Sequence, residues 1–210
     1  MAYRTDPRLA PARFGVEAID EGLRSYMLSV FNYMALGLAI TGLVAFVVGT
    51  TPALYVPIFS SPLKWVVMLA PLGFVFFLSA RLHAMSVSAA QLTFWAFAAV
   101  MGLSLASIFL VFTGESIARV FFITAATFGA TALWGYTTKR DLTAMGSFLF
   151  MGLIGIVIAS LVNIFIGSSA LQFAISVIGV VVFTGLTAWD VQRIKSEYVE
   201  YSSAGELLAK

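Results

Sequence analysis

Six long apolar segments dominate this sequence and limit what it can fold into. They cover roughly residues 27–48, 65–80, 92–112, 120–136, 144–166 and 171–189. A helix needs about 20 apolar residues to cross the hydrocarbon core of a bilayer. The chain has 210 residues and is 60% hydrophobic but only 10% charged, which is more apolar than one water-soluble core can hide. We therefore predict an all-α polytopic membrane protein with six transmembrane helices in this chain.

The basic residues between these segments predict the orientation. If the N-terminus is cytoplasmic, ten of the twelve Lys and Arg residues lie inside, and only Lys64 and Arg119 lie outside. Loops on the cytoplasmic side are enriched in Lys and Arg. We therefore expect a cytoplasmic N-terminus and, after six spans, a chain end on the same side. The first 25 residues are polar and of mixed charge, so no cleavable signal peptide is expected.

Three regions are expected along the chain. Residues 1–25 form a cytoplasmic tail with a short amphipathic helix, whose apolar positions recur at Val16, Ile19, Leu23 and Met27. That helix is expected to lie on the membrane surface and to run into the first span. Residues 26–195 form the six-helix transmembrane domain, and residues 196–210 form a polar C-terminal segment.

Small residues at four-residue spacing predict places where the helices pack closely, since small side chains let helix backbones approach each other in lipid. The candidate pairs are Ala125 with Gly129, Ala126 with Ala130, and Gly155 with Ala159.

Composition also excludes several functions. The net charge is only +2 and the basic residues are scattered, so nucleic acid is not an expected partner; the expected partner is the lipid bilayer. The chain has no Cys and one His, which excludes disulfides, thiolate chemistry and metal sites built from several histidines. No HExxH or GxSxG motif and no His within a span is present, so we expect no enzyme, no catalytic residue and no cofactor.

Asp190 is the main candidate for a functional residue. It ends the last apolar segment and is followed closely by Arg193 and Lys195. An ionisable residue at such a place is costly and therefore indicates function. Calcium prefers oxygen ligands, so Asp190 is a weak candidate site for a transiently bound calcium ion, and Thr184 and Thr187 precede it at i−6 and i−3 as further oxygen donors on an ion path.

A plainer interpretation of Asp190 stays open. The carboxylate then lies in water and pairs with Arg193 one turn further on, a contact worth only a few tenths of a kcal/mol. Arg81 is a second candidate partner, because the second and sixth segments run in the same direction and bring Arg81 and Asp190 to the same membrane level. Arg81 is then either a latch to Asp190 or only part of the cytoplasmic positive charge.

Four ordered blocks of this chain closely resemble the bacterial branch of the Bax inhibitor-1/YccA family, also called transmembrane Bax inhibitor motif proteins. The blocks are GLSLASIF (102–109), TGESIARVFFITAATFGATALWGYTTKRDL (113–142), MGSFLFMGLIGIVIASLVNIF (145–165) and SVIGVVVFTGLTAWDVQRIK (176–195). The likeness runs from about Arg24 to the end of the chain.

The resemblance implies a fold and two alternative functions. Members are described as seven-helix proteins of the membrane, here the bacterial inner membrane, and bacterial members resemble calcium-leak channels gated by pH. Two aspartates share a proton in them, one at the position of Asp190 and one in a seventh helix, while a basic residue at the position of Arg81 forms a latch. This chain stops at Lys210, where that seventh helix would begin, so the resemblance implies either a truncated chain or a protein without that helix. The alternative is a non-conducting regulator, because some bacterial relatives associate with a membrane-bound protease.

Overall fold

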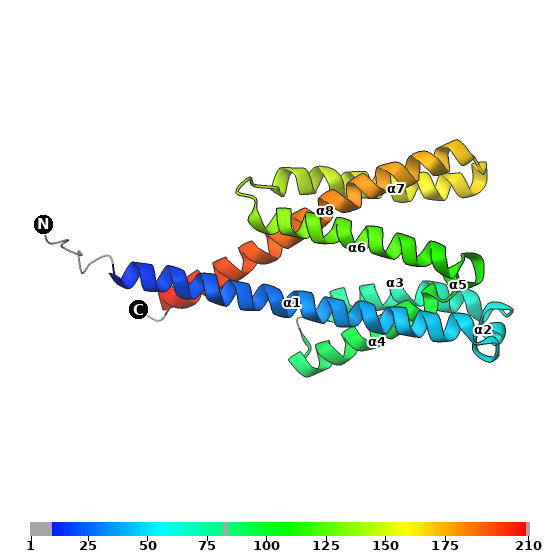
Figure 1. The fold of residues 1–210 in the computed structure, drawn as a ribbon, viewed down its shortest axis with the longest axis horizontal. Coiled ribbons are helices and arrows are strands. Elements are labelled where there is room, and N and C mark those ends of the chain that lie inside the picture. The colour runs from blue at the N-terminus through cyan, green and yellow to red at the C-terminus, as the bar shows by residue number, and fades with distance from the viewer. Residues whose placement is uncertain (1–9, 82–83, 209–210) are drawn as a thin grey trace, which may run out of the picture. The chain divides into compact units, whose positions relative to one another are not determined.

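The computed structural model describes the backbone of residues 10–81 and 84–208 and the side chains of residues 21–81 and 84–202. Within these ranges the regular elements are all helices (Figure 1), and their bounds are α1 Ala10–Thr50, α2 Pro52–Phe59, α3 Leu63–Arg81, α4 Val87–Leu105, α5 Ile108–Val111, α6 Gly114–Thr137, α7 Thr143–Ile166 and α8 Ser169–Leu208.

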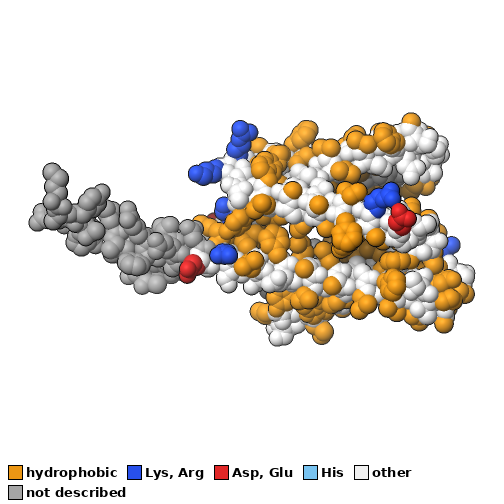
Figure 2. Space-filling model, viewed as in Figure 1, with side chains coloured by type: hydrophobic (Ala, Val, Ile, Leu, Met, Phe, Trp, Pro, Cys, Tyr) orange, Lys and Arg blue, Asp and Glu red, His pale blue; other side chains and the backbone are white. Residues whose placement is uncertain are grey.

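Six stretches of this structure are long and apolar enough to cross a membrane, which confirms the predicted spans. They are Glu21–Thr50, Leu63–Arg81, Val87–Val111, Gly114–Thr137, Thr143–Ile166 and Ser169–Ser202. Hydrophobic side chains are spread over the whole described part of the face shown in Figure 2, where Lys, Arg, Asp and Glu are few. Apolar side chains on the surface are favoured in contact with lipid chains and disfavoured in contact with water.

The described residues at both ends of the chain are helical. The N-terminal helix runs into the first span, since α1 is one helix from Ala10 to Thr50. The side chains of Val16 and Ile19 on its predicted apolar stripe lie outside the described residues. Leu23 on its apolar stripe is only 5% exposed, and Gly22 beside it approaches the Tyr198 side chain of α8, so this part of α1 packs on protein. The polar segment after residue 195 continues α8 as helix to Leu208.

The structure contains two details near the ends of the spans that the sequence analysis did not predict. The third span is interrupted at Ala106 and Ser107, so that α4 and the four-residue α5 share it. The connection after the first span contains the short helix α2, which starts at Pro52 after Thr51. Proline is favoured in the first turn of a helix because its missing N–H would have no intrahelical partner there.

The chain divides into two compact units, which are described separately. The unit of residues 26–120 contains most of α1 together with α2 to α5. In it Thr41 of α1 donates a hydrogen bond of 2.8 Å from Oγ1 to the carbonyl oxygen of Ala98 in α4. A Cβ added to Gly102 would lie 2.8 Å from Cβ of Val44, so glycine permits this close crossing of α1 and α4.

The other unit contains residues 1–25 and 121–210, and its centre is an antiparallel hairpin of α7 and α8 (Figure 1). Gly167 ends α7 with a φ of 65°, a left-handed conformation that glycine adopts without steric cost. The amide N–H of Ser168 donates to Oδ1 of Asn163 at 3.0 Å, which completes the tight connection between α7 and α8. Leu149, Val182 and Leu186 form the buried core between the two helices.

The predicted small-residue pairs are not the places where the described helices pack. Ala125, Ala126 and Ala130 are exposed, and a Cβ on Gly129 or Gly155 would meet nothing within 4 Å outside its own helix. The close approach in α6 occurs instead at Gly135, where an added Cβ would lie 2.9 Å from Cα and 3.0 Å from the carbonyl carbon of Ala188 in α8.

This contrast gives a matched pair of variants in one helix. We expect Gly135→Ala to lower the midpoint of thermal unfolding in detergent, because the new methyl group overlaps the α8 backbone and overpacking costs about 1–3 kcal/mol. Gly129→Ala, which adds the same methyl group in open space, should leave the midpoint unchanged or raise it, since Ala favours helix more than Gly. Equal midpoints for the two variants would contradict the close packing of α6 on α8.

Candidate functional site

The candidate site lies on α8 between Ala188 and Lys195, where this helix passes α6 and α7. Ala188 is completely buried against Gly135 of α6. The indole of Trp189 lies over Gly146 of α7, so closely that a Cβ on Gly146 would come within 2.5 Å of ring atoms. Gly135 of α6 and Gly146 of α7 thus allow α8 to pack closely against both helices, and they determine which residues of α8 lie at the two contacts.

Gln192 joins α8 to the loop between α6 and α7. Its Nε2 donates to the carbonyl oxygen of Arg140 at 2.7 Å, and its Oε1 accepts from the amide N–H of Leu142 at 2.8 Å. The side-chain amide therefore pairs with the loop backbone through both its donor and its acceptor, as a neighbouring strand would.

Lys195, almost one turn further along α8, is bound to the end of α6. Its Nζ donates to the carbonyl oxygen of Tyr136 at 2.8 Å and lies 5.2 Å from the centre of the Tyr136 ring. A cation at the C-terminal end of a helix is favourable, because the last carbonyl groups have no partner within the helix. Gln192 and Lys195 together form what we call the α8 clamp.

Asp190 lies on the side of α8 that faces away from this clamp. Successive helix residues are rotated by about 100°, so Asp190 lies about 160° around the axis from Gln192 and about 140° from Lys195. The residue is exposed, and among the described residues its carboxylate makes no hydrogen bond and no ion pair. About 20 residues cross the hydrocarbon core, so a span that begins at Ser169 brings Asp190 to the opposite membrane boundary.

The two threonines lie at different angles from Asp190. Thr187 is about 60° away and Thr184 about 120° away around the helix axis. Both are half-buried, and the hydroxyl of Thr187 donates to the carbonyl oxygen of Phe183 in its own helix at 2.8 Å. Thr187 is therefore the better placed of the two to offer an oxygen beside Asp190.

The two basic candidates have different surroundings. Arg193 makes its ion pair with Glu197, from Nε to Oε1 at 3.0 Å, and its charge also acts on Asp190 without an ion-pair contact. Its guanidinium lies 5.6 Å from the centre of the Trp189 ring. Arg81 is the exposed last residue of α3 and belongs to the other unit, so its latch to Asp190 stays a prediction.

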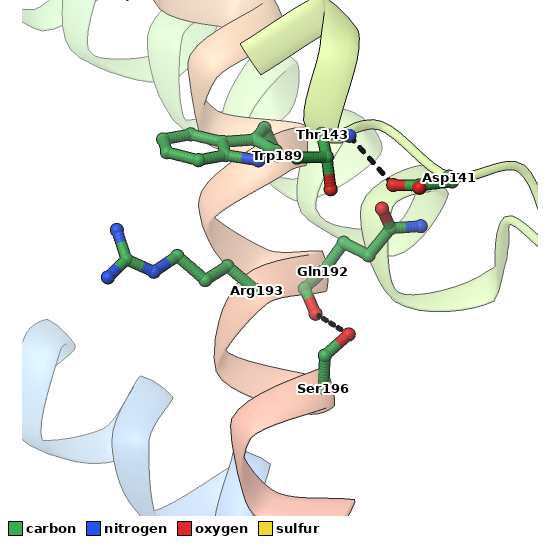
Figure 3. Close-up of a pocket in the computed structure, with 6 residues that line it drawn as sticks. All are labelled: Asp141, Thr143, Trp189, Gln192, Arg193 and Ser196. Carbon is green, nitrogen blue, oxygen red and sulfur yellow. Dashed lines mark hydrogen bonds between the residues drawn. The ribbon is translucent and has the colours of Figure 1, made fainter. Parts of the chain in front are cut away.

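A cavity of about 250 Å³ lies beside the clamp, where α8 passes the beginning of α7. We call it the interfacial pocket; it is lined by Asp141, Thr143, Trp189, Gln192, Arg193 and Ser196 (Figure 3). Asp141 accepts a hydrogen bond of 2.9 Å at Oδ1 from the amide N–H of Thr143. Hydrogen bonds from the side chain and backbone of Thr143 lower the pKa of Asp141 below its ordinary value, so this carboxyl group is charged at neutral pH.

The described residues contain no group of three or more His, Asp or Glu side chains that could hold a metal ion. Asp190 by itself offers one carboxylate, and a calcium site needs six to eight oxygen ligands. Any calcium bound by these residues is therefore weakly held.

Sequence reasoning missed the α8 clamp and the two glycines beneath it. Gln192 and Lys195 read as ordinary polar residues of a helix end, and their partners are backbone carbonyl and amide groups some 50 to 59 residues away. The one available signal was their three-residue spacing, which puts both on a single face of α8.

Fold and site together define a polytopic α-helical membrane protein whose last described span ends in charged residues tied to its neighbours. The chain belongs to the Bax inhibitor family: residues 23–208 match the family described as inhibitor of apoptosis-promoting Bax1.

Bacterial relatives support this membership. The chain is 50% identical over 182 residues to the Rickettsia prowazekii protein RP147, covering 87% of this chain and 77% of the relative. It is 43% identical over 202 residues to a Caulobacter vibrioides protein, covering 92% and 81%. It is 44% identical over 176 residues to the inner membrane protein YbhL of Escherichia coli, covering 83% and 75%, which agrees with the predicted bacterial inner membrane. No solved structure matches the chain.

The α8 clamp predicts a local effect of removing Gln192. In Gln192→Leu, a side chain of similar size, the Leu142 amide and the Arg140 carbonyl lose their partners, which should destabilise the fold by about 1–2 kcal/mol. Hydrogen–deuterium exchange should show faster exchange of the Leu142 amide. Ser196→Ala is the control, because the Ser196 hydroxyl bonds only to the Gln192 carbonyl oxygen of its own helix. Unchanged Leu142 exchange in Gln192→Leu would show that the clamp does not hold the loop.

Proposed function

We propose that the protein forms a pH-sensitive leak pathway for calcium or other cations, in which Asp190 binds the cation and the proton. The observation that carries this proposal is the position of Asp190 itself. Its carboxylate is at the end of a membrane span, on the face of α8 turned away from the clamp, with no hydrogen-bond or ion-pair partner among the described residues.

A carboxylate at such a place is costly unless it meets water, a cation or a proton. Structural residues avoid that cost by pairing, as Arg193 does with Glu197 on the same helix. The Asp190 carboxylate has no such partner among the described residues. Its oxygen atoms can therefore bind a passing cation when the group is ionised, and they no longer attract the cation when the group is protonated. A second carboxylate close to it would share the proton and strengthen cation binding, as the family resemblance implies.

The non-conducting regulator remains the second candidate. It is favoured by the exposed small residues of α6, since Ala125, Ala126, Gly129 and Ala130 offer an open surface on which another transmembrane helix could pack. Its partner would be a membrane-bound protease or another membrane protein complex.

Calcium flux into liposomes separates these functions. We expect the chain to leak calcium with a rate that changes between pH 6 and 8, and Asp190→Asn to abolish the pH dependence because the titrating group is gone. Glu200→Gln is the control, since it removes an exposed carboxylate from the same helix. Coincident curves without leakage for the parent and Asp190→Asn would exclude conduction and favour the regulator.

The Arg81 latch has its own test by a double-mutant cycle. If Arg81 pairs with Asp190, the changes in unfolding midpoint caused by Arg81→Gln and Asp190→Asn should not add in the double variant, because either one already breaks the pair. Arg24→Gln combined with Asp190→Asn serves as the control. Additive changes in the first cycle would assign Arg81 to topology alone.

A further inference from the structure

The interfacial pocket has a charge arrangement that the proposed conduction does not use. Figure 3 shows the Arg193 side chain extending to one side of α8, while Asp141 lies on the other side next to Thr143 and the end of Gln192. A hollow of about 250 Å³ thus has a cation on one side and an anion on the other.

Arg193 keeps free hydrogen-bond donors in this arrangement. A guanidinium has five N–H donors, and the contact with Glu197 uses only the one on Nε. The four N–H groups of the terminal nitrogens form a planar fork that matches two oxygen atoms of a phosphate. The contact with Glu197 is solvent-exposed and such pairs contribute only about 0–1 kcal/mol, so it is a weak competitor for the cation.

Asp141 keeps free acceptor capacity. An ionised carboxylate has about four lone-pair sites, and the backbone and side chain of Thr143 use two of them. The hydrogen bonds from Thr143 that lower the pKa of Asp141 also keep the group charged at neutral pH. This carboxylate can therefore accept hydrogen bonds from an ammonium group.

The pocket lies at the level of the lipid headgroups. It is built where the span of α6 has ended at Thr137, where the span of α7 begins at Thr143, and beside Trp189. Tryptophan is enriched at this boundary, since its ring is apolar and its N–H is polar. A ligand that carries both charges and lies at this depth is a zwitterionic phospholipid.

We propose that the interfacial pocket binds the phosphoethanolamine headgroup of a phospholipid, with the phosphate on Arg193 and the ammonium on Asp141. Lys139, Arg140 and Lys195 nearby attract any lipid phosphate, so selectivity rests on Asp141. An anionic headgroup without an ammonium leaves that carboxylate without a cation. A choline headgroup has no N–H to donate to it.

Short-chain lipids added to the full chain in detergent test this proposal through the unfolding midpoint. We expect phosphatidylethanolamine to stabilise the parent protein at concentrations at least tenfold lower than phosphatidylcholine or phosphatidylglycerol. Stepwise N-methylation of the ethanolamine should weaken the effect at each step. This headgroup series needs no variant, and equal stabilisation by all lipids would overturn the proposal.

Variants of Asp141 and Arg193 then test which residue binds the ammonium group and which binds the phosphate. Asp141→Asn should abolish the preference for phosphatidylethanolamine over phosphatidylglycerol, and Arg193→Gln should weaken binding of every phosphate lipid, with partial recovery in Arg193→Lys. Lys139→Gln, which removes a neighbouring cation outside the pocket lining, should keep the preference. An unchanged preference in Asp141→Asn would overturn the assignment.

Soluble glycerophosphoethanolamine, added in the same assay, distinguishes the two sources of this headgroup. We expect it to stabilise the protein far less than the lipid, because it lacks the acyl chains that hold the headgroup at the membrane boundary. Equal stabilisation would show that the ligand is a soluble phosphoethanolamine ester, and it would overturn the proposal that the pocket binds a phospholipid.

Discussion

Lipid offers no hydrogen-bond partner to a peptide group, and this constraint governs the structure. Each unsatisfied backbone group costs several kcal/mol in the bilayer, so the spans form helices that satisfy their own N–H and C=O groups. Where a helix ends, another part of the chain must complete the bonding. Lys195 does so for the Tyr136 carbonyl at the end of α6, and Gln192 does so for the loop that follows.

Most of the fold was predictable because span length and hydropathy are local properties of the sequence. The six apolar segments and the hairpin at Gly167 follow from them directly. The short helix α2 was missed because Pro52 marks the end of one apolar segment and also the first turn of the next helix. The small-residue pairs were placed wrongly since their spacing does not say which glycine meets a neighbour; Gly135 and Gly146 do, and Gly129 and Gly155 do not.

The site was predictable only in part, for a related reason. Asp190 stands out as a charge beside an apolar segment, which is visible in the sequence alone. That Asp190 faces away from α6 and α7 depends on how α8 is rotated, and this rotation is set by Ala188, Gln192 and Lys195 through residues far away in sequence. Side chains that bond to a distant backbone leave no periodic pattern, so the clamp could be found only in three dimensions.

The uninterrupted course of α8 has a mechanical consequence. Asp190 and Leu208 lie on one helix, about 27 Å apart at 1.5 Å per residue. A rigid rod of this kind acts as a lever, in which a small tilt at the membrane boundary becomes a larger displacement at the far end. A tilt of α8 near Asp190 would therefore move whatever touches the last turns of this helix, without any refolding between the two points.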